Sequence, residues 1–230
     1  MDFKAQLTAW RHYLHQYPET AFEEKTAPRL VAEQMRAWGI QVEEGVGRTG
    51  VVGTLKCGNG KGCIGFRADM DALDITERSC HDHISLHPGK MHGCGHDGHT
   101  VMLLGAAKLL AERKNFNGTV RFIFQPAEEP GRGAQAMIDD GLFERFPVDE
   151  IYGLHNAPFL PAGTLSTRVG AWLPARMIFP SPSPGKEAML LLPTKAMIHW
   201  LLLRKSTWLS RPLSAGMRRL CVRWWSPARK

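Results

Sequence analysis

Short apolar segments alternate with helical patterns along the first 155 residues, and this alternation restricts the chain to few folds. Each predicted helix has one apolar face, as the spacing of Leu7, Trp10 and Leu14 illustrates. The strands are predicted at 50–55, 63–66, 120–124 and 150–154, and the helices at 3–16, 27–38, 97–111 and 134–140. Strands that alternate with helices predict an α/β domain with a mixed or parallel sheet.

The composition changes abruptly near residue 171. Residues 173–230 hold eleven Lys and Arg with one acid, Glu187, whereas the rest of the chain holds 18 basic and 21 acidic residues. Five of the seven tryptophans also lie at or beyond Trp172. We therefore divide the chain into a body, 1–171, and a basic tail, 172–230. The charge of the tail suggests nucleic-acid or membrane binding, but no recognised motif accompanies it, and we expect neither partner.

The sequence predicts a soluble, cytoplasmic protein. Its five cysteines are odd in number and irregularly spaced, so they do not indicate a disulfide framework. Residues 1–17 lack the apolar segment of a signal peptide. The longest apolar run, 189–203, is interrupted by polar residues and proline and is too short to span a bilayer.

Polar segments follow the predicted strands and carry the candidate chemistry. Asp69 and Asp71 close one strand, 126–129 follows another, and His155 follows a third, while 92–99 leads into a helix. Ligands of open α/β sheets bind beyond the carboxyl ends of the strands. We therefore expect the four segments to converge on one edge of the sheet.

The residue types in these segments suit metal ions. Cys94 and His96 lie two apart in a glycine-flanked loop, and a thiolate with an imidazole suits zinc, manganese, cobalt or nickel. Glu128 and Glu129 are adjacent, and in an extended segment they would point to opposite sides, so that one ligates while the other transfers protons. His155 offers a further nitrogen. Two metal ions would polarise a carbonyl and lower the pKa of a water.

Each of these features has an ordinary structural explanation when it stands alone. A cysteine and a histidine two residues apart are often incidental, and paired glutamates after a strand are usually solvated. Asp69 could be a loop carboxylate without a role. We interpret the run His81, His83 and His87 as exposed loop, because no glycine or carboxylate scaffold accompanies it. The joint occurrence of four strand-end segments favours a metal site.

Five motifs of the body resemble the aminoacylase and hippurate hydrolase group of co-catalytic metallopeptidases. The resemblance extends from about Leu14 to Gly170. It implies a three-layer α/β catalytic domain with a mixed sheet, incomplete here, that uses two divalent metal ions to hydrolyse the amide of a small N-acyl amino acid. The motifs are RADMDAL at 67–73, HPGKMHGCGHDGHT at 87–100, FQPAEE at 124–129, GAQAMIDDGLF at 133–143 and GLHNAP at 153–158.

The resemblance also implies a role for each site residue. Glu128 would be the general base that activates water and then protonates the leaving amine, and Asp69 would orient a metal ligand. The implied ligands are Cys94, shared by both metals, with His96, Glu129 and His155. The sequence departs from the family pattern at Asp74, where the family usually has proline, and at 78–83, RSCHDH, which has no recognised counterpart.

The tail departs from the family altogether, and a frame slip near 170–172 explains the departure. The family continues with a lid domain and a last metal-ligating histidine. When permissible codons for 177–208 are read from each third base into the next codon, they can give a segment containing GKGGHAAAPH, which resembles the opening of that lid. We therefore expect the lid, the last ligand and the family homodimer interface to be lost, and the chain to be poorly soluble and nearly inactive. The alternatives are an inactive metal-binding fragment, or a pseudo-enzyme that binds a partner such as an intact paralogue.

Overall fold

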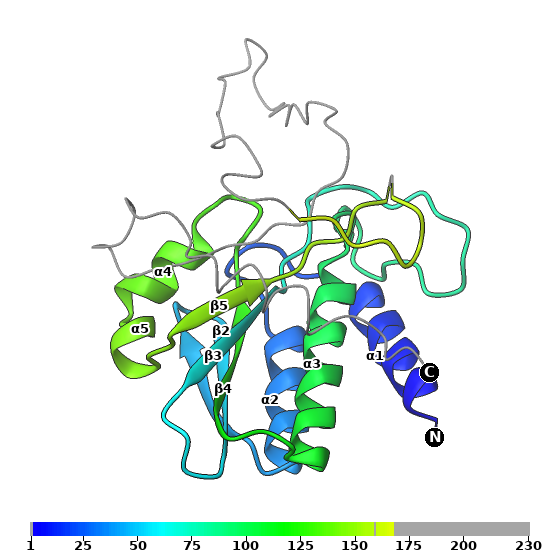
Figure 1. Cartoon of the computed structure of the whole chain (residues 1–230). Helices are drawn as coiled ribbons and strands as arrows, with labels where there is room; N and C mark the ends of the chain where they lie inside the picture. The colour runs from blue at the N-terminus through cyan, green and yellow to red at the C-terminus, as the bar shows by residue number, and fades with distance from the viewer. Residues whose placement is uncertain (1, 159, 168–230) are drawn as a thin grey trace.

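The computed structural model describes residues 2–158 and 160–167, which form five strands and five helices (Figure 1). The predicted tail, 172–230, lies outside the described residues. The elements in chain order are α1 Phe3–Gln16, α2 Thr26–Ala37, β1 Gln41–Val46, β2 Gly50–Cys57, β3 Cys63–Asp69, α3 His96–Arg113, β4 Gly118–Gln125, α4 Gly133–Asp139, α5 Leu142–Arg145 and β5 Glu150–Gly153.

The strands form one mixed sheet in the order β1-β2-β4-β3-β5. β2 is antiparallel to both β1 and β4, while β3 is parallel to both β4 and β5. The sequence predicted every element except β1 and α5. β1 is an edge strand that is largely exposed, so its sequence QVEEGV lacks the alternation of apolar and polar residues that identifies a half-buried strand.

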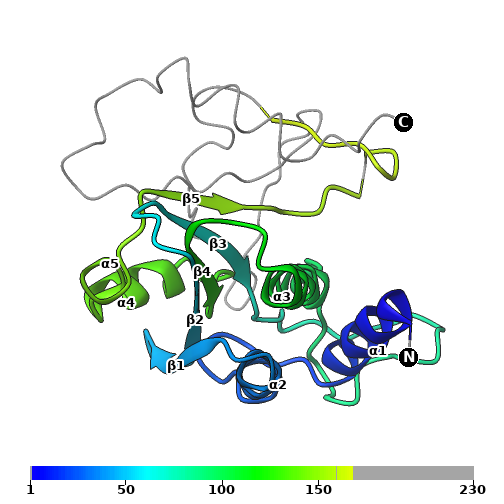
Figure 2. The ribbon, with the colours of Figure 1, turned by 60° about the horizontal axis from the view of Figure 1, so that its bottom comes forward.

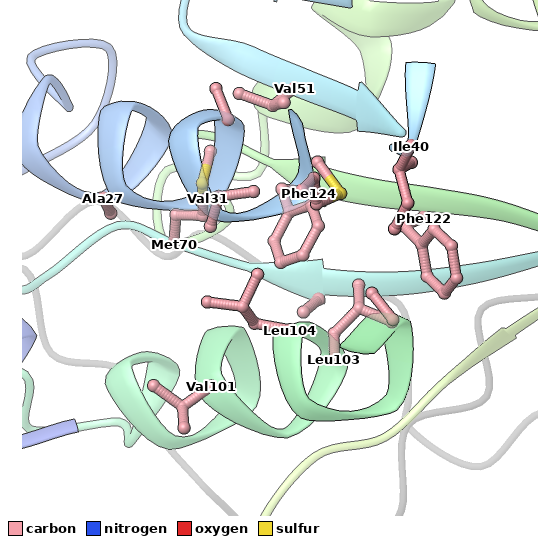
Figure 3. Packing of buried hydrophobic residues seen from close by; sticks show 14 of the residues in the cluster. Ala27, Val31, Ile40, Val51, Met70, Val101, Leu103, Leu104, Phe122 and Phe124 are labelled. Carbon is pink, nitrogen blue, oxygen red and sulfur yellow. The ribbon is translucent and has the colours of Figure 1, made fainter. Parts of the chain in front are cut away.

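Helices cover both faces of the sheet, which confirms the predicted three-layer α/β fold (Figure 2). α2 and α3 pack on one face, with α1 against α3, and the larger apolar core lies there. Figure 3 shows the buried side chains of Val31, Leu104 and Phe124 pointing toward one another between α2, α3 and β4. α4 and α5 cover the other face through a smaller core around Met137 and Phe143. Burial of these side chains is what fixes the layers.

The three parallel strands end at the same edge of the sheet. β3 ends at Asp69, β4 at Gln125 and β5 at Gly153, and α3 begins at His96 beside them. The predicted convergence of the four polar segments therefore follows from the topology. Among the helices that the structure describes, none combines the length and the apolar character that crossing a bilayer requires.

Candidate metal centre

His96 lies at the middle of the cluster that forms where the strands end. Its imidazole is fully buried, and its Nε2 atom has no hydrogen-bond partner in the described part of the chain. Three carboxylate oxygens surround that nitrogen. They belong to Asp69 at 3.6 Å, Glu129 at 3.7 Å and Glu128 at 4.0 Å. These separations are too long for hydrogen bonds but close to the spacing of about 3.3 to 3.8 Å between two ligands of one tetrahedral ion.

Two overlapping sets of donor atoms contain His96. One set joins Cys94, His96 and Glu129, and the other joins Asp69, His96, His99 and His155, with all donor atoms of a set within 4.8 Å of one another. The Cys94 Sγ atom lies 3.5 Å from His155 Nε2, so the two sets adjoin. The structure thus brings together all six residues that the sequence singled out. His96 belongs to both sets, and the role of Cys94 as the ligand shared by two metals stays a prediction.

Asp69 is held by two neighbours at the base of the centre. The guanidinium of Arg67 donates to Asp69 Oδ2 at 2.8 Å and to Gln125 Oε1 at 2.9 Å. His99 Nδ1 contacts Asp69 Oδ1 at 2.6 Å, while the Asn156 backbone N–H donates to His99 Nε2 at 2.9 Å. Both ring nitrogens of His99 therefore already have partners, and His99 is better placed to orient Asp69 than to ligate.

Asp71 contacts both His96 and Glu129, a position in the centre that the sequence analysis did not assign to it. Its Oδ1 atom lies 3.3 Å from His96 Nδ1, and its Oδ2 atom accepts the backbone N–H of Glu129 at 2.9 Å. One buried carboxylate thus contacts both the imidazole of His96 and the backbone amide of Glu129. A carboxylate on the far nitrogen of a ligating imidazole directs the near nitrogen toward the metal. The second acid of RADMDAL was the signal available in the sequence.

The segment that carries Glu128 and Glu129 is a turn, so the predicted extended conformation is wrong. Both side chains approach His96, although Glu128 is 34 % exposed and Glu129 only 12 %. The turn packs so closely that a Cβ atom on Gly133 would lie 1.6 Å from the Pro126 carbonyl oxygen. The two glutamates therefore differ in their exposure to solvent, and not in the direction in which they leave a strand.

The charges at the centre favour a cation. Burial opposes protonation of His96, but the neighbouring Asp71 and Cys94 side chains and the charges of nearby carboxylates raise its pKa to about 11. Burial and the neighbouring His99 lower the pKa of His155 to about 4, which keeps that ring neutral. Burial and the charge of Asp69 raise the pKa of Glu128. A neutral imidazole suits ligation, and a carboxylate of raised pKa suits proton transfer near neutral pH.

The histidine run after β3 is not the exposed loop that the sequence suggested. His81, His83 and His87 are each partly buried. His83 stacks between His81 and His12, with ring centroids 3.9 and 3.7 Å away, and His87 Nδ1 contacts the Pro18 carbonyl at 2.8 Å. The run packs against the residues of α1 and its carboxyl end, a tertiary contact that local sequence does not reveal.

The comparison with known families matches this geometry. The family model described as Peptidase family M20/M25/M40 matches residues 65–226, which is more than half of the chain. The chain belongs to this family. The match includes every residue of the centre, and it also extends beyond residue 171, so it does not mark the boundary between body and tail.

Individual relatives agree with the family. The chain is 49 % identical to a hippurate hydrolase of Campylobacter jejuni over 159 residues, which are 69 % of this chain and 41 % of that protein. It is 40 % identical to an N-acetyl-L-cysteine deacetylase of Bacillus subtilis over 190 residues, which are 82 % of this chain and 45 % of that protein. The crystal structure of the Bacillus subtilis YXEP protein, a dinuclear metal binding peptidase of this family, has a TM-score of 0.69 at 38 % identity and covers 73 % of this chain and 47 % of its own. The chain spans less than half the length of each.

Proposed function

We propose that the described residues are the metal-binding part of an amidohydrolase that cleaves the amide of small N-acyl, hippurate-like amino acids. The observation that supports this most strongly is the buried Nε2 atom of His96 amid three carboxylates. The relatives that act on N-acyl amino acids support the substrate class. Because the chain spans only part of those relatives, its own turnover is a separate question.

The residues fit a pair of divalent ions. We assign Cys94, His96, Glu129 and His155 as ligands, because they supply the thiolate, imidazole and carboxylate donors that zinc, manganese, cobalt and nickel accept. A nitrogen buried without a hydrogen bond carries a cost that coordination would remove. The chemistry that such ions supply when bound is polarisation of the amide carbonyl and activation of water.

The side chains of the centre then have distinct tasks. Glu128 is the more exposed of the paired glutamates, and we assign it to accept a proton from the attacking water and return it to the leaving amine. We assign Asp69 and Asp71 to position the other groups of the centre: Asp69 is held by His99, and Asp71 contacts His96. These two carboxylates are positioning residues, since neither faces solvent.

We further propose that the tail, 172–230, results from a frame slip and replaces the lid, the last metal ligand and the family dimer interface. The change of composition near residue 171 supports this proposal. If it holds, the 230-residue chain binds metal weakly at one position and turns over slowly. A catalytically inactive metal-binding fragment is the second candidate function, because the four proposed ligands all lie within the described residues.

Metal removal tests the proposed function. The chain is stripped with a chelator, then supplied with zinc or manganese, and release of free amine from a panel of N-acyl amino acids is measured beside thermal stability. We expect any hydrolysis to require the metal, and saturating metal, at about 100 times its Kd, to stabilise the fold by about 2.7 kcal/mol. Hydrolysis that survives the chelator would contradict the assignment, as would the absence of any stabilisation by either metal.

A further inference from the structure

We infer that the chain has a second, peripheral site for a divalent transition-metal ion, formed by His15, Glu77 and His81. We call these three residues the His15 cluster. Their donor atoms all lie within 4.8 Å of one another. The Glu77 Oε1 atom lies 3.2 Å from His15 Nε2 and 3.1 Å from His81 Nε2, so one carboxylate oxygen faces two imidazole nitrogens.

The scaffold of the His15 cluster is that of a metal site. His15 is buried, and its other ring nitrogen, Nδ1, lies 2.8 Å from the Asp97 carboxylate, which also accepts from Arg11 at 3.3 Å. A carboxylate on the far nitrogen of an imidazole fixes the ring and raises its basicity as a ligand. The other oxygen of Glu77 accepts the Ser85 backbone N–H at 2.6 Å. Two of the three donors are thus held in place by groups that remain outside the cluster.

The third donor comes from the segment that departs from the family pattern. His81 belongs to RSCHDH, 78–83, and Figures 1 and 2 show the loop between β3 and α3 passing beside α1. His81 stacks on His83, and its Nδ1 atom is buried without a hydrogen-bond partner among the residues described. The ring is therefore held with Nε2 on Glu77 and gains nothing from its other nitrogen. Nε2, which faces the same carboxylate oxygen as His15 Nε2, is therefore the nitrogen of His81 that would ligate.

The donor set indicates which ion the cluster would bind. Two imidazoles and one carboxylate leave a fourth tetrahedral position open, and this set suits zinc, cobalt, nickel or copper better than magnesium or calcium. The side chain of His81 is 36 % exposed, whereas His15 and Glu77 are nearly buried, so an ion can enter from the side of His81. Asp97, which contacts His15, directly follows His96 in the sequence, so one short segment contacts both the His15 cluster and the main centre.

Cobalt binding to a variant with a disabled main centre tests the inference. In the full chain carrying His96→Ala and His155→Ala, which leaves neither donor set of the main centre with three donors, we expect one Co²⁺ ion per chain, seen by calorimetry and by visible absorption. Adding His81→Gln keeps a hydrogen-bonding group beside Glu77 but removes one proposed ligand. This change should weaken Co²⁺ binding by at least about tenfold, because even the loss of a residue that only contacts a metal ligand lowers metal affinity by about that factor. The matched control is His12→Ala, which removes a stacked ring but no donor and should leave the affinity unchanged.

The outcomes separate this inference from the proposed function. No Co²⁺ binding to the double variant, or binding that His81→Gln does not weaken, would show that the His15 cluster is only a hydrogen-bonded network. In the chain that carries His81→Gln alone, the main centre can be measured by itself. If the main centre does not bind metal while the His15 cluster binds Co²⁺, the proposed function is overturned and this inference stands. Circular dichroism of each variant checks that the fold is kept.

Discussion

Inserting one base near codon 171 is expected to raise the rate of hippurate hydrolysis by at least about 100-fold over the 230-residue chain. The insertion shifts the reading of the tail to the frame in which permissible codons give GKGGHAAAPH. In the family that this segment resembles, its histidine helps to stabilise the oxyanion of the tetrahedral intermediate, and removal of one such donor typically costs about 10² to 10³ in rate. Return of the last metal ligand should add to the gain. The measurement is release of glycine from hippurate by the two purified proteins at equal metal loading.

Two controls make that experiment decisive. Inserting three bases at the same place lengthens the chain without changing the frame, and should leave the rate low. Sequencing of the locus shows which frame the gene uses. If no neighbouring frame encodes the lid segment, or if the 230-residue chain already hydrolyses N-acyl amino acids at an ordinary rate, the frame-slip proposal is wrong.

Glu128→Gln is expected to lower kcat by about 10² to 10⁴ while leaving the bound metal in place. The neighbouring variant Glu129→Gln is expected to lose metal as well as activity. The two side chains face the same nitrogen of His96, but Glu128 is partly exposed and Glu129 is nearly buried. The frame-corrected protein provides the turnover measurement, and the 230-residue chain provides the metal content of both variants.

The pair of variants serves as its own control, because each replaces a glutamate by its isosteric amide in the same turn. Equal metal loss in Glu128→Gln and Glu129→Gln would show that both are ligands. Full turnover in Glu128→Gln would remove Glu128 from the chemistry. Either result would contradict the division of tasks between them.

The sequence predicted those parts of the centre that depend on residue type and strand order. Parallel strands bring Asp69, Glu128 and His155 to one edge, and this follows from recognising where each strand ends. The extended conformation assigned to the paired glutamates failed, because the positive φ of Ala127 and the buried Glu24, which accepts the Ala127 N–H at 2.9 Å, shape a turn there. That contact joins residues 103 positions apart, so local sequence could not reveal it.

The sequence did not reveal how the side chains of the centre are oriented. The two acids of RADMDAL are equivalent as sequence letters, yet Asp69 contacts Arg67 and His99 whereas Asp71 contacts His96. The edge strand β1 escaped prediction for another reason, because exposure removes the apolar alternation that burial imposes. Tertiary packing against α1 likewise made the histidine loop partly buried.

Cobalt bound through Cys94 is the most direct test of the central claim, that this edge of the sheet is a metal centre. A thiolate ligand gives Co²⁺ a charge-transfer absorption in the near ultraviolet, which imidazole and carboxylate ligands do not produce. We expect the chain loaded with Co²⁺ to show this absorption, Cys94→Ser to abolish it, and Cys63→Ser, at the opposite end of β3, to leave it intact. A chain that shows no thiolate absorption, or one whose absorption persists in Cys94→Ser, would contradict the account.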